Sequence, residues 1–148
     1  MDALQRSAAP AAAVRTATIA DVRPVLALWR HSRSIAATTP DTEEALVGLL
    51  ARDPGALIVA EVGGEIVGSL IAAWDGWRGD MYRLAVAPEH RRRGIGRALV
   101  KAGESRLRAV GARRVTALVG ESDERAAAFW RSNGYPRDLA TVRHVRNL

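Results

Sequence analysis

The fold is decided by the stretch Leu84-Ala85-Val86-Ala87-Pro88-Glu89-His90-Arg91-Arg92-Arg93-Gly94-Ile95-Gly96-Arg97-Ala98-Leu99-Val100. Residues 81–86 read as a strand, and Pro88 ends it. A basic turn that contains glycine follows the proline. Beyond Gly94 the apolar residues recur at spacings of three to five, which predicts an amphipathic helix; they are Ile95, Leu99, Ala102, Leu107 and Val110.

A strand, a glycine turn and a helix in this order predict a site for an anion. Glycine lets the backbone approach a ligand closely, and the amides of the first helical turn have no partner within the helix. The arginines at positions 91–93 add positive charge around those amides. A basic triplet is also typical of a solvated surface or a nucleic-acid-binding patch, so the glycines and the flanking elements carry the argument.

The turn resembles a motif of the GNAT superfamily of N-acetyltransferases. Its spacing, Arg91-x-x-Gly94-x-Gly96, matches the R/Q-x-x-G-x-G/A pattern of that family, and the resemblance extends over residues 14–148. It implies that the turn holds the pyrophosphate of acetyl-coenzyme A and that the preceding strand contacts the thioester and the pantetheine arm. The residues implicated are Arg91, Arg93, Gly94, Ile95, Gly96 and Arg97 in the turn, and Leu84, Ala85 and Val86 in the strand.

A second block near the C-terminus also resembles this family. Asp123-x-x-Ala126-x-x-Phe129-Trp130-x-x-x-Gly134-Tyr135 is similar to its N-x-x-A-x-x-F-Y-x-x-x-G-F/Y block, which borders the coenzyme. Asp123 replaces the usual asparagine, so an acceptor stands where the family has a donor and an acceptor. Trp130 replaces a tyrosine that often protonates the departing thiolate. Both aromatic residues also fit plain core packing.

The resemblance implies a base on the strand that precedes the turn. An alkylammonium has a pKa near 10, so the amine must lose a proton before it attacks the thioester. Two-residue alternation predicts that Asp80, Tyr82, Leu84 and Val86 share one face, provided that no bulge shifts the register. Asp80 and Tyr82 are the two candidates, and the sequence does not decide between them. Asp80 also suits a turn, and Tyr82 a half-buried strand position.

Substrate contacts in the family come from the first two helices, the loop between them and the front strands. The corresponding side chains are Trp29, His31, Arg33, Trp74 and Trp77. The segment Trp74-Asp75-Gly76-Trp77-Arg78-Gly79 also resembles a D-G-x-R-G hairpin of a poorly characterised bacterial subgroup. Taken individually, each of these residues fits a structural or merely exposed position better than a substrate contact.

Composition narrows the class of protein. The chain has 148 residues, 48% of them hydrophobic, which suits one domain with a substantial core. It has no cysteine, so disulfides and thiolate chemistry are excluded, and its three histidines show no metal-ligand spacing. No apolar run is long enough to predict a membrane span. The net charge of +6 comes almost entirely from arginine, because the only lysine is Lys101.

The order of elements predicts a mixed α/β fold of the GNAT type. Turn and cap signals give a strand, two helices, three strands, a helix, a strand, a helix and a last strand over residues 141–145. This order implies a mostly antiparallel sheet with one parallel crossing and about four helices. Candidate caps are Asp21 for the first helix, Asp41 with Glu44 for the second, and Ser122 or Asp123 for the last. Gly63-Gly64 predicts a hairpin, and Gly68 predicts a bulge or a close backbone approach. Residues 1–13 are expected to be a flexible tail, and residues 14–148 a single domain.

These observations predict an enzyme that transfers an acetyl group from acetyl-coenzyme A to a primary amine of a small molecule or a protein. The predicted enzyme needs no metal, is cytoplasmic, acts as a monomer or homodimer, and binds no membrane. One alternative is a coenzyme A-binding module without turnover, which is permitted because position 130 is tryptophan instead of the usual tyrosine. A basic nucleic-acid-binding domain is a weaker alternative, since no recognition motif accompanies the arginines.

Overall fold

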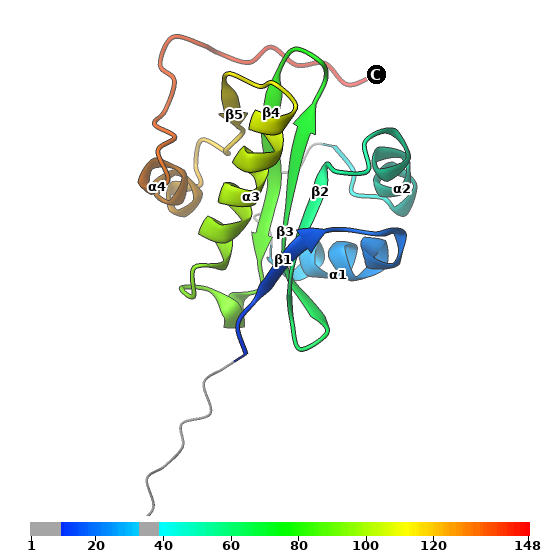
Figure 1. Cartoon of the computed structure of the whole chain (residues 1–148). Helices are drawn as coiled ribbons and strands as arrows, with labels where there is room; N and C mark the ends of the chain where they lie inside the picture. Colours follow the sequence, from blue (N-terminus) through cyan, green and yellow to red (C-terminus); the bar gives the residue numbers. More distant parts are fainter. Residues whose placement is uncertain (1–9, 33–38) are drawn as a thin grey trace, which may run out of the picture.

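The computed structural model describes residues 10–32 and 39–148, and it contains one five-stranded mixed sheet. The strands lie in chain order, and every pair is antiparallel except the last, β4 with β5. Figure 1 shows the sheet with helices on both faces. The strands are β1 (Ala13–Thr16), β2 (Leu57–Val62), β3 (Glu65–Trp74), β4 (Gly79–Val86) and β5 (Val115–Ala117).

Four α-helices and two short 3-10 helices complete the described chain. α1 and α2 cover one face of the sheet, and α3 lies along the other face with α4 beside it (Figure 1). The helices are α1 (Val22–Ser32), α2 (Glu43–Arg52), α3 (Ile95–Ala109) and α4 (Glu124–Ser132), with η1 (Ile19–Asp21) and η2 (Pro88–His90). The predicted fold class is therefore confirmed, including the parallel crossing from β4 through α3 to β5.

Close packing of α3 on the sheet depends on two glycines. A Cβ atom on Gly68 of β3 would lie 3.0 Å from side-chain carbons of both Ile95 and Leu99. One on Gly103 of α3 would lie 2.8 Å from Met81 Cε and 2.9 Å from a Leu70 methyl carbon. The close backbone approach expected at Gly68 is thus present, and it fixes where the N-terminus of α3 meets the end of β4.

β4 contains a bulge, and the bulge changes which side chains share a face. Ser69 lies opposite Ala85, but Ile71 lies opposite Tyr82, so β4 has one residue more than β3 in this interval. Arg83 lies in that interval with a left-handed backbone, φ +55°. Directly opposed residues of an antiparallel pair point to the same face. The expected alternation therefore holds for Asp80 and Tyr82, opposite Ala73 and Ile71, and is wrong for Val86, which lies opposite Gly68.

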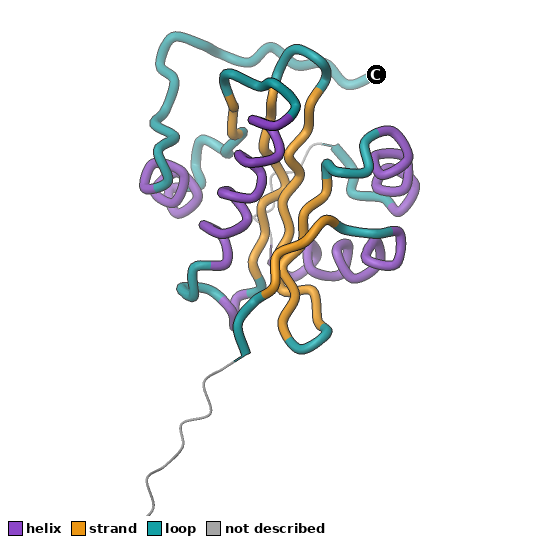
Figure 2. Tube along the Cα trace, in the orientation of Figure 1, coloured by secondary structure: helices purple, strands orange, loops and turns teal. Residues whose placement is uncertain are grey.

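Two local predictions are also wrong. Asp41 does not cap α2; the Thr42 hydroxyl accepts a hydrogen bond from the Ala45 amide at 3.1 Å, and Asp41 binds Arg83 instead. Residues 141–145 form no strand, and Figure 2 shows the segment after α4 as loop up to the C-terminus. Val142 and Val145 are each 79% exposed, so β-branched residues lack the neighbouring strand that this conformation needs.

Asp21, expected to cap the first long helix, is the centre of a charged network at the start of α1. Both of its carboxylate oxygens accept hydrogen bonds from Arg15 of β1, at 2.7 and 2.9 Å. The Thr18 amide donates to the same carboxylate at 2.8 Å. The Arg15 guanidinium, and then these Thr18 contacts, lower the pKa of Asp21 from 3.8 to about 2. The network therefore ties β1 to the beginning of α1.

We expect Asp21→Asn to lower the free energy of unfolding by about 1–2 kcal/mol at pH 7, because a charged hydrogen-bond acceptor is lost. A depressed folded-state pKa stabilises the protein above pH 3.8, and this stabilisation disappears as pH falls to about 2. Denaturant unfolding of both proteins across this range should give curves that converge at the acid end. Glu43→Gln, which removes an exposed pair with Arg23, is the matched control and should change little.

Candidate active site

The turn between β4 and α3 exposes the N-terminus of the helix. Gly94 is the N-cap of α3 with φ +80°, a conformation that favours glycine, and Arg92 is also left-handed at φ +62°. No side chain caps this end, and the first helical bond runs from the Ala98 amide to the Gly94 carbonyl at 3.0 Å. The three amides before Ala98 therefore have no helical partner, which suits an anionic group.

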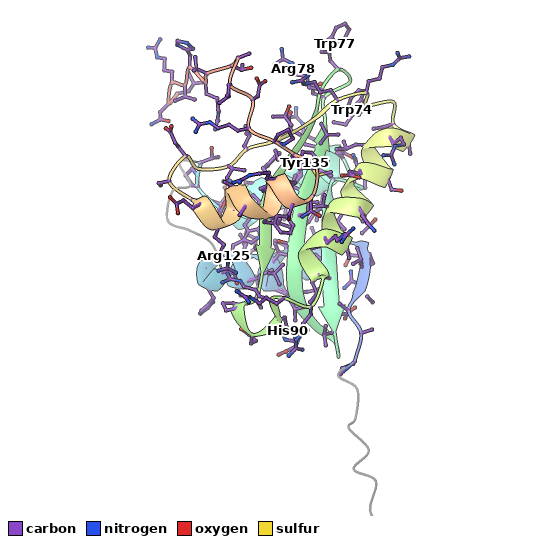
Figure 3. The ribbon with its side chains drawn as sticks, turned by 90° about the vertical axis from the view of Figure 1, so that its left-hand side faces the viewer. Trp74, Trp77, Arg78, His90, Arg125 and Tyr135 are labelled. Atoms are coloured by element: carbon purple, nitrogen blue, oxygen red, sulfur yellow. The ribbon has the colours of Figure 1, made fainter. Side chains whose placement is uncertain are left out.

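Arg91 anchors the turn rather than projecting freely from it. Its Nε donates to the Val86 carbonyl at 3.0 Å, and its Nη2 donates to the Ser32 carbonyl at 3.2 Å. Partial burial, followed by the charge of Arg125 on α4, lowers the pKa of Arg91. Figure 3 shows Arg125 pointing from α4 toward the segment that contains His90. Two guanidinium groups from separate elements thus converge on one end of the sheet.

The other residues predicted in the turn contribute in different ways. Arg93 and Arg97 are exposed, whereas the Ile95 side chain is buried in the core and leaves only its amide toward the turn. A Cβ on Gly96 would lie 3.0 and 3.2 Å from the Phe129 ring. Gly96 therefore provides room for α4 to pack on α3, a requirement that the motif alone does not indicate.

β4 and β5 separate beyond their short pairing. Gly79, Asp80 and Met81 pair with residues 115–117, and the last bond, from the Leu118 amide to the Met81 carbonyl, is 3.4 Å long. Among the described strands, none pairs with residues 82–86 on this side of β4. The unpaired edge includes Leu84, Ala85 and Val86 and leads to the turn. It offers backbone hydrogen-bonding groups to an extended ligand.

Asp80 and Tyr82 lie on one face of β4, opposite Ala73 and Ile71 of β3. Desolvation raises the pKa of Tyr82, the Arg83 charge opposes this effect, and the Asp80 and Asp53 charges add to it. Tyr82 is therefore protonated at neutral pH. Ala85 shares this face because of the bulge, and Val86, opposite Gly68, faces α3.

The second motif spans α4 from its N-cap, Asp123, to Tyr135 just beyond its end. Asp123 is the N-cap, and its carboxylate accepts a hydrogen bond from the Ala126 amide at 3.0 Å. Trp130 is only 5% exposed and packs edge-on against Phe129 and Tyr135, with ring centroids 5.6 and 5.1 Å apart. The Tyr135 hydroxyl donates to Glu104 of α3 at 2.8 Å. This cluster joins α4 to α3.

The predicted substrate residues are spread over the molecule. Trp29 is 5% exposed and donates from its indole nitrogen to Ser69 at 2.7 Å, so it supports the sheet from within the core. His31 is exposed near the end of α1 and bonds the Ala27 carbonyl through Nδ1. Trp74 and Trp77 lie at the β3–β4 turn, at the opposite end of the sheet from His90 (Figure 3). Arg33 lies outside the described residues.

Two contributors, Arg83 and Arg125, were not identified from the sequence. Each lies next to a recognised position, Arg83 within the strand and Arg125 within the second block. A charged residue at such a position carries no periodic signal, because its partners come from distant segments. Only the arrangement of α1, α2 and α4 around β4 identifies them.

The fold and the turn together define a mixed α/β domain in which a partly unpaired strand edge leads to a helix N-terminus without a side-chain cap. A sequence model described as the acetyltransferase (GNAT) family matches residues 22–135. An acetyltransferase of Yersinia pseudotuberculosis is 34% identical over 115 residues, which cover 78% of this chain and 81% of the relative. The chain belongs to the acetyltransferase (GNAT) family, and it is an acetyl-coenzyme A-dependent N-acetyltransferase.

Solved structures share this fold. The PaiA N-acetyltransferase of Thermoplasma acidophilum, solved with coenzyme A, has a TM-score of 0.73 at 16% identity and covers 83% of this chain and 88% of its own. An aminoglycoside acetyltransferase from an uncultured soil metagenomic sample, solved with sisomicin, has a TM-score of 0.73 at 21% identity, with coverages of 93% and 96%. The fold is therefore shared by acetyltransferases that differ widely in sequence.

Within residues 10–32 and 39–148, no three histidine or acidic side chains gather closely enough to hold a metal ion. None of the helices in these ranges combines the length and the apolar character that crossing a bilayer requires.

We expect Gly96→Glu to weaken coenzyme A binding at least tenfold, or about 1.4 kcal/mol. The new side chain would displace Phe129 and bring negative charge to the helix end that should hold the phosphates. Titration calorimetry measures the effect. Gly48→Glu on α2, where a Cβ would meet nothing within 4 Å, is the matched control. Unchanged affinity in a folded Gly96→Glu protein would remove the turn assignment.

We expect Trp130→Tyr to change kcat by less than about tenfold, because position 130 is buried in an aromatic cluster. Its main effect should be a lower free energy of unfolding, from the smaller ring. Steady-state kinetics and thermal unfolding separate the two effects. A hundredfold gain in kcat would instead show that this chain lacks an acid beside the leaving thiolate.

Proposed function

We propose that the protein transfers the acetyl group of acetyl-coenzyme A to a primary amine of a small molecule or a protein terminus. The observation that carries the proposal is the unpaired edge of β4, which leads directly to the uncapped N-terminus of α3. The edge suits an extended pantetheine arm, and the helix end suits a pyrophosphate.

The chemistry of the turn fits coenzyme A. Arg91 and Arg125 share one region, and the mutual repulsion of their charges favours a bound anion. Amides at the beginning of α3 have no side-chain cap that would compete with such a ligand. Acetyl-coenzyme A supplies the activated thioester, and the backbone amides of Leu84–Val86 are the groups available to polarise its carbonyl.

Asp80 is the better candidate for the proton acceptor. The raised pKa of Tyr82 keeps its hydroxyl protonated at neutral pH, so Tyr82 has no free phenolate to accept the amine proton directly. Asp80 and Tyr82 share one face of β4, and the negative charge of Asp80 contributes to the raised pKa of Tyr82. We propose that Asp80 receives the amine proton through Tyr82 or water, and that Tyr82 orients the amine.

The leaving thiolate needs no dedicated acid in this proposal. A thiol with a pKa near 8.5 is a tolerable leaving group at neutral pH when nearby amides support its charge. Trp130 is buried and Tyr135 is bonded to Glu104, so neither is a candidate donor. This separates the proposal from mechanisms that use a tyrosine on α4.

The alternative of a binding module without turnover is tested together with the acceptor class. Purified protein is incubated with acetyl-coenzyme A and, separately, sisomicin, spermidine or a peptide with a free N-terminal alanine. Release of free thiol that depends on one amine supports transfer and names the acceptor class. Tight coenzyme A binding without thiol release from any amine would favour the module. Cytoplasmic location, a monomer or homodimer, and the hairpin subgroup stay predictions.

We expect Asp80→Asn to lower kcat about 100-fold near neutral pH, the usual scale for loss of a general base. The defect should shrink as pH rises toward the amine pKa near 10, because the free amine then needs no base. Tyr82→Phe is the comparison variant and should lose less than Asp80→Asn. A loss of kcat in Asp80→Asn that is equal at every pH would contradict this role.

A further inference from the structure

We infer that Arg83 is a positioning residue that fixes the start of α2 against the bulge of β4, and thereby sets the acceptor-amine side of the site. The inference rests on the proposed acceptor chemistry for its kinetic consequence, but its structural basis is independent of the acceptor. It concerns a side chain that the motifs leave unassigned.

The backbone at Arg83 adopts a conformation that suits glycine better than arginine. Its φ of +55° lies in the left-handed region, where a Cβ atom is unfavourable. A glycine would form the same bulge without that strain. The arginine side chain must therefore make interactions that compensate for the conformation.

Those interactions reach the segment that leads into α2. Arg83 Nε donates to Asp41 Oδ1 at 2.8 Å, and a terminal nitrogen donates to the Thr39 carbonyl at 3.0 Å. The Arg83 side chain is 18% exposed, so the pair is partly shielded from water. The next residue, Thr42, caps α2. One guanidinium thus holds two points immediately before the helix.

A buried hydrogen-bond chain from α1 through β3 supports the bulge. The Trp29 indole donates to the Ser69 hydroxyl at 2.7 Å, and that hydroxyl donates to the Arg83 carbonyl at 3.4 Å. The Arg83 guanidinium also lies 6.0 Å from the centroid of the Trp29 ring, within range of a cation–π contact. Ser69 is fully buried in β3, and these two hydrogen bonds satisfy its hydroxyl there.

The held segment borders the reacting face of β4. Tyr82, the neighbour of Arg83, and Asp80 carry the proposed proton path, and the bulge begins immediately after Tyr82. Movement of residues 39–41 away from the bulge would enlarge the space beside Tyr82 without touching the phosphate turn. Loss of Arg83 should therefore impair use of the amine much more than binding of coenzyme A.

The first test is kinetic and compares Arg83→Gly and Arg83→Lys with the wild type. Glycine accepts the bulge conformation but removes the guanidinium, and lysine keeps the charge but cannot reach both partners. With sisomicin, spermidine and the alanine peptide as acceptors, we expect the amine KM to rise at least tenfold in Arg83→Gly and less in Arg83→Lys. The coenzyme A Kd should stay within about twofold.

The second test needs no turnover. Hydrogen exchange of the amides at residues 45–47, where α2 begins, should accelerate at least fivefold in Arg83→Gly because the helix start is no longer held. Arg23→Ala is the matched control: it also removes an arginine paired with the start of α2, at Glu43, but that pair is exposed and does not involve β4 residues. It should leave exchange, amine KM and coenzyme A Kd unchanged.

Two results would overturn the inference. One is unchanged exchange at residues 45–47 in Arg83→Gly, and the other is a rise in coenzyme A Kd as large as the rise in amine KM. If the wild type transfers acetyl to none of the three amines, the proposed acceptor class fails. The exchange measurement then still decides whether Arg83 holds α2.

Discussion

The bulge in β4 is the constraint on which the arrangement of the site depends. One extra residue between Tyr82 and Ala85 shifts the alternation, so Ala85 rather than Leu84 returns to the face that carries Asp80 and Tyr82. A bulge also increases local twist, which is consistent with the separation of β4 from β5 beyond Met81. The separation leaves the backbone of residues 82–86 without a partner among the described strands on the β5 side of β4.

The other end of the site depends on how closely the helices approach the sheet. Gly68 and Gly103 let α3 lie against β3, while Gly96 leaves room for the Phe129 ring of α4. Each of these three glycines leaves out a side chain where two elements meet, whereas Gly94, with φ +80°, serves the backbone conformation of the turn. The two glycines of the motif therefore have different physical tasks, although the sequence pattern treats them alike.

The sequence predicted features that are local and periodic. The helix after Gly94, the cap at Asp123 and the hairpin at Gly63–Gly64 all have short-range signals, and each is present. The bulge depends on strand register, and the Arg83–Asp41 pair depends on a contact between distant segments. Neither can be predicted from the spacing of residues in the sequence. The strand predicted over residues 141–145 failed for a related reason: β propensity describes fit to a neighbouring strand, and this segment has none.

The arginine bias of the chain has a consequence for self-modification. Guanidinium groups stay protonated and are poor nucleophiles, whereas a lysine amine is a natural acceptor of acetyl groups. Within this sequence the only ε-amine belongs to Lys101, which is exposed on α3. The basic surface that attracts an anionic cofactor is thus largely inert toward the acetyl group which that cofactor carries, and its charge is preserved through repeated turnover.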